Sequence, residues 1–366
     1  MRKKIFVVSD IHGHCCELKK ALEKAGFRVN DEAHLLILCG DYFDRGEENR
    51  AVFEYLNTIQ NKILIKGNHE DMLMLLLDEK HIGNGGFSNG MDTTLRDFFG
   101  DAVFGELDPY YQSALQLRFE GKEDIVAALH SFSDHMYDYF ETERYIFTHG
   151  WLPTVKTEDG SCYIKEDFRY EQPETWKRAR FAEWYRRYHQ GAMLADKTIV
   201  CGHRTSRFGC LFDETRDVTD FSPFYANGLI AIDTATAESK QVNVLIIEDE
   251  DISFETHWMS LKTEPFSQIR SGEKYVEMRL FDEKRKKIRV GDRIVFTHTE
   301  NEEETIRTRV VGLHKYGSFD EMLLDFPASA LGVADRNKNL DKIMSSYYAE
   351  EDIQRYGTLA IRLMLE

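Results

Sequence analysis

The amino-acid sequence predicts an α/β fold with a buried, substantially parallel sheet, followed by a second and smaller domain of short strands and turns. Three observations lead to this prediction. Apolar runs alternate with amphipathic stretches over the first 70 residues, and the pattern of hydrophobic residues changes after residue 256. The length of 366 residues is also more than one typical core accommodates.

The first part of the chain is expected to run strand, helix, strand, helix, strand. The apolar runs 5–8, 35–39 and 62–65 have the length of buried strands, and apolar residues recur at helical spacing between them. The later elements expected are strands at 145–147, 198–201, 229–232 and 242–247, a helical insert at about 91–140, and a helix at about 173–189. The acidic stretch 248–251 is poorly patterned and is the expected linker to the second domain.

Composition narrows the class of protein and its compartment. Hydrophobic residues make up 42% and charged residues 30%, the balance of a folded globular protein. No apolar run approaches the ~20 residues of a membrane span, and the stretch 5–8 is too short for a signal-peptide core. We therefore expect a cytoplasmic protein with no membrane partner. The six cysteines form no CxxC pair, which favours reduced thiols over disulfides or a structural zinc site.

Charge is distributed unevenly along the chain. Nearly all of the formal net charge of −17 lies in residues 1–256, whereas residues 257–366 are close to neutral. An acidic surface argues against broad electrostatic capture of nucleic acid by the first part. Anionic substrates remain open, because bound divalent metal ions invert the local field.

Five short polar motifs each follow directly after one of the apolar runs. They are DIHG at 10–13, GDYFDRG at 40–46, GNHE at 67–70, THG at 148–150 and CGHR at 201–204. In open α/β sheets, sites form beyond the carboxyl ends of the strands, so these residues can converge on one cleft. Their carboxylates, imidazoles and one amide oxygen suit a pair of divalent metal ions such as Mn, Fe, Zn or Ni.

With these motifs in this order, about residues 1–250 resemble the calcineurin-like metallophosphoesterases, and most closely the bacterial and phage-type branch of the PPP phosphatases. The resemblance implies a calcineurin-like α/β sandwich and two divalent metal ions, Mn first, with Fe, Zn or Ni as alternatives. In the family's pattern, Asp10 and His12 hold the first metal, Asp41 bridges both, and Asn68, His149 and His203 hold the second.

The same resemblance assigns the remaining catalytic roles. Two metal ions can activate a bridging water that attacks phosphorus in line. His69 resembles the general acid that protonates the departing oxygen, and Asp44 resembles the carboxylate that orients it. Arg45 can make a bidentate contact with phosphate. The stretch 176–180 looks like the phage-type W-x-R-x-R, which makes Arg178 the candidate second phosphate contact; the alternative is a solvated basic face of a helix.

Residues 257–366 resemble the ASCH domain, a small PUA-like β-barrel. The strings that carry this resemblance are SGEKYVEMR at 271–279 and GDRIVF at 291–296. Such domains are linked by resemblance to RNA or modified-nucleoside handling, so RNA is an expected partner. The candidate ligand cleft consists of Lys274, Glu277 and Arg279, and the alternative is a solvated strand face with an ion pair.

One activity of the ASCH superfamily fits this chain poorly. Some small members are amidohydrolases that act on acetylated cytidine, and they carry a threonine where this chain has Glu277. The basic run 284–289 can contact phosphates, or it is only a solvated turn.

The sequence therefore predicts a metal-dependent phosphoesterase domain over residues 1–250 and an ASCH domain over residues 257–366. The first function expected is hydrolysis of phosphate esters of the Ser/Thr-protein or small-molecule type. The alternative is a nucleotide, dinucleoside polyphosphate or RNA-end phosphohydrolase whose ASCH domain binds RNA. A third hypothesis, a nucleic-acid-binding protein with a vestigial phosphatase core, is disfavoured by the complete ligand set and by His69.

Overall fold

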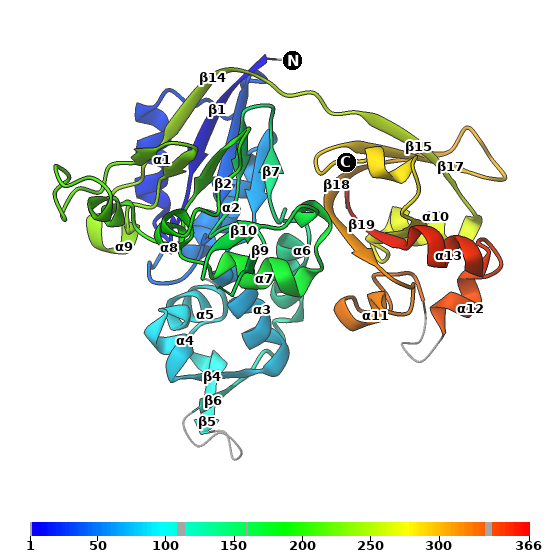
Figure 1. Ribbon diagram of the computed structural model, residues 1–366. Coiled ribbons are helices and arrows are strands. Elements are labelled where there is room, and N and C mark those ends of the chain that lie inside the picture. The colour runs from blue at the N-terminus through cyan, green and yellow to red at the C-terminus, as the bar shows by residue number, and fades with distance from the viewer. Residues whose placement is uncertain (1, 108–113, 159, 334–338) are drawn as a thin grey trace. The chain divides into compact units, whose positions relative to one another are not determined.

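The chain folds into two compact units. The computed structural model describes residues 2–107, 114–158, 160–333 and 339–366 (Figure 1). The first unit comprises Met1–Ile164 and Lys177–Ile252, and the second comprises Lys165–Trp176 and Ser253–Glu366.

The first unit contains a four-stranded sheet in the order β14-β1-β2-β3. Its strands are β1 (Arg2–Val8), β2 (His34–Cys39), β3 (Lys62–Ile65) and β14 (Leu245–Asp251). The strands β1, β2 and β3 run parallel, and β14 is antiparallel to β1. Every residue of β2 is buried, as expected for a strand that is covered on both faces.

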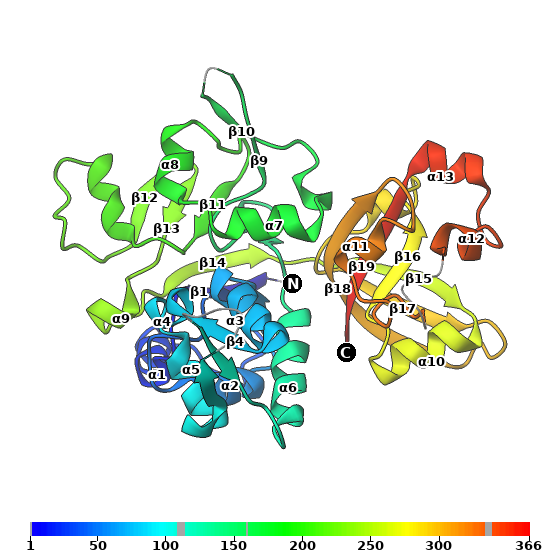
Figure 2. The same cartoon turned by 90° about the horizontal axis from the view of Figure 1, so that it is seen from below.

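A second, five-stranded sheet has the order β12-β13-β11-β8-β7. Its three inner strands, β8 (Tyr145–Phe147), β11 (Thr198–Cys201) and β13 (Leu229–Ala231), run parallel, and β7 (Phe140–Glu141) and β12 (Phe224–Ala226) are antiparallel edges. The helices α1 (Cys15–Lys24), α2 (Asn49–Thr58) and α3 (Asn68–Glu79) lie on one side of the first sheet, and the second sheet lies on its other side (Figure 2). This layering is the α/β sandwich that the sequence predicted.

The insert expected to be helical is partly strand. Within about 91–140 lie α5 (Met91–Phe99), η1 (Asp101–Val103) and α6 (Glu123–Asp134), and α4 (Asn84–Ser88) precedes them. The same range also contains the strands β5 (Phe104–Leu107) and β6 (Ala114–Leu117), which form a small sheet in the order β4-β6-β5 with the preceding β4 (His81–Gly83); residues 108–113 lie outside the described part. These strands are short and half exposed, so they lack the alternation of apolar residues that identifies a strand in sequence.

The helix expected at about 173–189 is two helices, α7 (Pro173–Arg180) and α8 (Trp184–His189). The carbonyl oxygen of Ala179 accepts a hydrogen bond from the backbone N–H of Trp151 at 3.0 Å and another from Ala182 at 3.1 Å. The contact with Trp151 satisfies a carbonyl group at the end of α7, and sequence periodicity does not reveal it.

The linker prediction for residues 248–251 is wrong. These residues belong to β14, where Asp251 is paired with Arg2 and Glu250 with Lys3 of β1. The Glu250 carboxylate is buried and accepts a hydrogen bond from Nε of Arg144 at 2.8 Å. Glu248 forms an ion pair with Lys4 at 3.1 Å. Basic residues that are distant in sequence thus compensate the acidic run and allow it to form a strand.

The second unit is built on one curled half-barrel sheet in the order β15-β17-β18-β19-β16. Its strands are β15 (Thr256–Leu261), β16 (Val276–Leu280), β17 (Arg293–His298), β18 (Thr305–Tyr316) and β19 (Thr358–Leu365). Its helices are α10 (Thr263–Ser271), α11 (Met322–Asp325), α12 (Leu340–Met344) and α13 (Glu350–Tyr356). Buried residues of β16 and β19 pack with residues of these last three helices into a core of their own.

The stretch Lys165–Trp176 belongs to this second unit although it lies far from it in sequence. His314 Nδ1 donates to the carbonyl oxygen of Glu171 at 2.7 Å, and Gln172 donates to the carbonyl oxygen of Lys315 at 2.9 Å. Across the described residues, no helix combines the length and apolar character that crossing a bilayer requires.

Candidate metal centre

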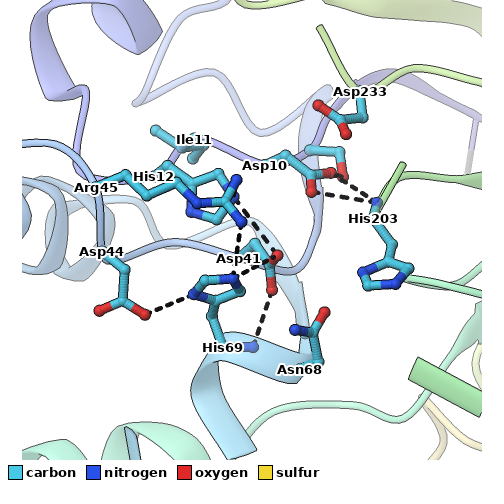
Figure 3. Close-up of polar contacts among 12 residues, drawn as sticks. Asp10, Ile11, His12, Asp41, Asp44, Arg45, Asn68, His69, His203 and Asp233 are labelled. Atoms are coloured by element: carbon cyan, nitrogen blue, oxygen red, sulfur yellow. Dashed lines mark hydrogen bonds and ion pairs between the residues drawn. The ribbon is translucent and has the colours of Figure 1, made fainter. Parts of the chain in front are cut away.

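The loops that follow five strands of the first unit carry the predicted metal ligands. Asp10 and His12 follow β1, Asp41 follows β2, Asn68 begins α3 after β3, His149 follows β8 and His203 follows β11. The two sheets therefore both contribute side chains to one place (Figure 3). Except for the half-buried His203, these side chains are buried.

Asp41 lies between two groups of potential ligand atoms. It forms one group with His12 and His69 and another with His149 and His203, and the ligand atoms of each group lie within 4.8 Å of one another. Asp41 Oδ2 is 3.6 Å from Nε2 of His12, and Asp41 Oδ1 is 3.3 Å from Nε2 of His149.

Two further ligands are tied to the second group. Nε2 of His149 is also 2.9 Å from the Asn68 amide oxygen, and the Asp10 carboxylate accepts the backbone N–H of His203 at 3.0 Å. A carboxylate with a histidine group on either side of it is the arrangement that a metal-bridging residue requires.

The histidines present unprotonated nitrogens to this centre. Nδ1 of His12 donates to the carbonyl oxygen of Phe43 at 2.9 Å, and Nδ1 of His149 donates to that of Cys39 at 2.7 Å. With the proton on Nδ1, the Nε2 atom of each ring is the nitrogen that can bind a metal ion, as in metal-binding histidines generally. Among the described residues, Nε2 of His203 is a buried atom with no hydrogen-bond partner.

Burial keeps these imidazoles neutral, which is the form that binds metal ions. It lowers the pKa of His12 and of His149 below the ordinary value. Burial, followed by the neighbouring His149, lowers the pKa of His203 to about 3. The donor set, the fixed tautomers and the unpartnered nitrogen all fit divalent metal ions.

The backbone of the centre is strained. Nine non-glycine residues in the described part have a positive φ, and six of them lie here: Asp10 (53°), His12 (47°), Asp41 (58°), Asp44 (75°), Arg45 (66°) and His203 (65°). Such conformations cost on the order of 1–3 kcal/mol each and persist only where the surroundings impose them. These strained conformations lower the stability of the fold, and they place the side chains close to one another.

Glu70 holds two of the loops together, a role that the motif alone did not reveal. Its buried carboxylate accepts the backbone N–H groups of Gly67 at 2.8 Å, Asp41 at 3.0 Å and Tyr42 at 2.9 Å. Gly67 cannot be larger, because a Cβ there would lie 2.2 Å from Asp41 Oδ1. The spacing of Gly67 and Glu70 is that of a helix capping box, which is the sequence signal that could have identified this contact.

Asp233 is a second residue that sequence reasoning missed. It follows β13, is buried, and lies near Asp10 (Figure 3). Burial raises the pKa of Asp233 to about 6. The pKa of Asp10 is raised as well, mainly by burial and next by the negative charge of Asp233. Because Asp233 directly follows the apolar run 229–232, the strand-end rule that selected the other ligands could have found it.

His69, Asp44 and Arg45 form a hydrogen-bonded chain beside the centre. Nδ1 of His69 donates to Asp44 Oδ2 at 2.6 Å, and Asp44 is fully buried. Burial lowers the pKa of His69, but Asp41 and Asp44 outweigh it and hold this pKa above the ordinary value. Arg45 donates to Nε2 of His12 at 2.9 Å and to Nε2 of His69 at 3.2 Å. The positively charged guanidinium of Arg45 thus lies at Nε2 of His12, which is the nitrogen that can bind a metal ion.

Comparison with known proteins identifies both parts of the chain. The family model of the calcineurin-like phosphoesterases matches residues 3–231, and that of the ASCH domain matches residues 259–365. The chain belongs to the calcineurin-like phosphoesterase family. It is therefore a hydrolase of a family that implies divalent metal ions, and its C-terminal part is an ASCH domain.

Individual relatives of this phosphoesterase match shorter stretches. A serine/threonine-protein phosphatase 2 of Salmonella typhimurium is 34% identical over 122 residues, 33% of this chain and 51% of that protein. A symmetrical bis(5'-nucleosyl)-tetraphosphatase of Buchnera aphidicola is 35% identical over 66 residues, 18% of this chain and 23% of that protein. The chain thus spans about half or less of these curated relatives. A solution structure of a Pyrococcus furiosus protein is 29% identical, covers 30% of this chain and 96% of that chain, and has a TM-score of 0.25.

The two arginines of the W-x-R-x-R stretch in this phosphoesterase differ in their surroundings. Arg178 is exposed on α7. Arg180 is buried, and its guanidinium pairs with Asp71 at 2.6 Å and with Asp138 at 2.9 Å. The carboxylates of Asp71 and Asp138 therefore hold Arg180. The role of Arg178 as a phosphate contact remains a prediction.

In the ASCH domain, the three residues of the candidate cleft form an ion-paired cluster. Glu277 lies 3.4 Å from Lys274 and 3.0 Å from Arg279. Lys274 and Glu277 are each only 3% exposed, so the alternative of a solvated strand face is wrong for them, although its ion pair is present. Beside Arg279 lies a cavity of about 290 Å³, which is also lined by Trp258, Ser260, Thr297, Lys284 and Arg285.

Proposed function

We propose that this chain is a binuclear metal-dependent phosphatase that hydrolyses phosphate monoesters of proteins or small molecules, with His69 as the general acid. The observation that carries the proposal is the position of the buried Asp41, with His12 near one carboxylate oxygen and His149 near the other. We assign residues 1–250 to the phosphatase domain and residues 257–366 to the ASCH domain. The segment Lys165–Trp176 is the exception, because it packs in the second unit.

The six predicted ligands would hold the ions, and Asp41, with a histidine near each of its oxygens, would serve both. Mn is proposed first, with Fe, Zn or Ni as alternatives, because carboxylate, imidazole and amide ligands suit all four. When bound, the two ions supply a water activated at neutral pH and neutralise charge on the phosphoryl oxygens.

The remaining steps belong to residues of the chain itself. His69 gives the proton on Nε2 to the departing oxygen, while its Nδ1 proton stays on the hydrogen bond to Asp44. A guanidinium has no acceptor, so Nε2 of His69 carries no proton while Arg45 donates to it. Arg45 must therefore turn away from His69, and the phosphate oxygens are the partner that draws it away through a bidentate contact. Arg178 is proposed as the second phosphate contact.

The second candidate function is hydrolysis of nucleotides, dinucleoside polyphosphates or RNA ends, with the ASCH domain binding RNA. The cavity beside Arg279 favours it. Trp258 is 59% exposed there and offers an aromatic face, and Lys284 and Arg285 offer positive charge. An aromatic ring beside cations is the combination that binds single-stranded nucleic acid. The bis(5'-nucleosyl)-tetraphosphatase relative agrees with this class of substrate.

One panel of assays tests both candidates. The purified chain is stripped of metal with EDTA, reloaded with Mn, and assayed with p-nitrophenyl phosphate, phosphopeptides, nucleotides, diadenosine tetraphosphate and 5′-phosphorylated RNA. We expect chelation to abolish hydrolysis and Mn to restore it. Hydrolysis that survives exhaustive chelation would remove the two-metal proposal, and the preferred substrate separates the two candidates.

A further inference from the structure

A short corner of the first unit presents an exposed phenylalanine beside the metal centre. Phe181 lies between α7 and α8, and its side chain is 44% exposed. The centroid of its ring is 6.4 Å from that of His203, and the two rings meet edge to face. No step of the proposed hydrolysis uses this ring.

The corner is fixed on its first side to the loop that carries His149. The residue after this ligand is Gly150, where a Cβ would lie 2.3 Å from the carbonyl oxygen of Arg180. The backbones therefore pack directly against each other, and the N–H of Trp151 donates to the carbonyl oxygen of Ala179 at 3.0 Å. The buried ion pairs of Arg180 with Asp71 and Asp138 anchor the same side.

On its other side, the corner is fixed to the loop that carries His203. The indole N–H of Trp184 donates to the carbonyl oxygen of Arg204 at 2.7 Å. The Arg204 guanidinium lies 3.2 Å from the Glu183 carboxylate, and their side chains are 46% and 21% exposed. The chain on both sides of Phe181 is thus fixed to the loops of two predicted metal ligands, and its apolar ring is partly exposed to solvent.

An exposed ring on a fixed stretch of backbone at the rim of a site is a ready contact for an apolar or aromatic part of the substrate. Phosphoserine and phosphothreonine are aliphatic and offer no ring to stack. In phosphotyrosine the ring is bonded directly to the phosphate oxygen and so lies against the phosphate itself. In a nucleotide the ribose separates the two, which lets a base reach the rim, where Glu183 and Arg204 offer an acceptor and donors to its edge.

We propose that Phe181 stacks on the nucleobase of a nucleoside phosphate and is a specificity-determining residue of this phosphoesterase. The inference rests on the proposed hydrolysis at the metal centre and specifies its substrate class. Because every base has a π-face, stacking makes the site tolerant of the base identity while rejecting sugar phosphates that lack a base.

The test compares two substrates that differ only in the base, adenosine 5′-monophosphate and ribose 5-phosphate. For the Mn-loaded full chain, we expect the ratio of their kcat/KM values to favour the nucleotide. Phe181→Ala should reduce this ratio about 5- to 100-fold, which is the value of stacking one base on an aromatic ring. Phe181→Trp should restore it. The matched control is Tyr225→Ala, which removes another exposed aromatic residue, on the edge strand β12.

The opposite outcomes are as clear. The proposal is overturned if Phe181→Ala lowers kcat/KM equally for both substrates, or if a phosphotyrosine or phosphoserine peptide loses as much as the nucleotide. If neither of these two substrates is hydrolysed, the proposed function fails only when p-nitrophenyl phosphate and the phosphopeptides are not hydrolysed either. The inference is then decided by calorimetric titration of adenosine 5′-monophosphate into the Mn-loaded protein. Binding that is weaker in Phe181→Ala than in the wild type and in Tyr225→Ala supports it, and equal or absent binding overturns it.

Discussion

Nδ1 of His69 donates a hydrogen bond to the Asp44 carboxylate at 2.6 Å, and this contact turns the other nitrogen of the ring toward Asp41 and Arg45. Asp44 is itself held, since its backbone N–H donates to the side chain of Asn49 at 2.8 Å. The imidazole therefore has one orientation, and its Nε2 can take part in proton transfer once Arg45 has turned away. This relationship leads to the first prediction.

Replacing His69 should affect substrates according to their leaving groups. We expect His69→Asn to lower kcat by about 10²- to 10⁴-fold for alkyl phosphate esters, which need a proton on the departing oxygen. Activated aryl esters should lose much less. Equal losses for both ester classes would mean that His69 positions water or substrate instead, and metal analysis of the variant serves as the control.

Arg45 and Arg178 are both proposed to contact the phosphate. Substituting alanine at either position should reduce kcat/KM about 10- to 100-fold while the metal content stays unchanged, because a charge-assisted bidentate contact is lost. Arg50→Ala, which removes an exposed arginine paired with Glu54, is the control. A wild-type rate for Arg178→Ala would favour the solvated helix face for this residue.

Asp233 should destabilise the metal-free protein. Its pKa is raised to about 6 in the folded state, compared with about 3.9 for an unfolded chain. The charged Asp233 therefore lowers the free energy of unfolding by the full amount above pH 6, and this loss disappears as the pH falls toward about 3.9. We expect Asp233→Asn to stabilise the EDTA-treated chain by about 1–3 kcal/mol at pH 7.5, with the gain gone below about pH 4. Urea unfolding at both pH values measures this. The exposed Asp196→Asn is the control, and an equal gain there would contradict the assignment.

Glu250 should show the opposite dependence on pH. Burial raises its pKa, but hydrogen bonds from Thr142 and Arg144 outweigh burial and lower it below the ordinary value. Its contribution to stability is therefore present above about pH 4.3 and is lost as the pH falls through the lower, folded pKa. Glu250→Gln should cost about 1–2 kcal/mol at pH 7 and progressively less as the pH falls through the lowered pKa of the folded state, by urea unfolding.

Glu248 provides a matched control on the same strand. Its side chain is 69% exposed and pairs with Lys4 at 3.1 Å, so Glu248→Gln should change the free energy of unfolding by about 0.5 kcal/mol or less. Similar effects of both substitutions would show that the burial of Glu250 is not what matters.

The ASCH cavity allows a separate test of RNA binding. If it takes single-stranded RNA, then Trp258→Ala should weaken binding about 5- to 100-fold through lost stacking. Lys284→Glu should weaken binding and flatten its dependence on salt, because fewer counterions are released. Hydrolysis of p-nitrophenyl phosphate should not change in either variant. If the intact chain binds no RNA by fluorescence anisotropy, the nucleic-acid proposal for this domain is wrong.

The sequence predicted which polar residues gather at the ends of the strands because their signal is local. A polar residue directly after an apolar run lies at a strand end, and parallel strands bring such ends together. Glu70 and Arg180 were not assigned, because their roles depend on partners that only the folded chain brings near: the backbone of Asp41 in one case, Asp71 and Asp138 in the other.

The wrong linker prediction has the same origin. An acidic run suggests a solvated segment when it is considered alone, and nothing near it in sequence indicates otherwise. Its partners Lys4 and Arg144 lie more than a hundred residues away, yet they allow residues 248–251 to complete β14. Likewise, the residue pairs of the β4-β6-β5 sheet depend on packing rather than on periodicity.

The ligands come from two separate sheets, with Asp41 after β2 and His149 after β8. An ion bound by both residues is therefore a cross-link that closes a loop of roughly 100 residues, and such closure removes conformational freedom mainly from the unfolded chain. Metal loading should accordingly slow amide hydrogen exchange in β8 and β11 as well as in β1 and β2, while the exchange of β15–β19 stays unchanged. The metal centre would then be the place where the two halves of the sandwich become one cooperative unit.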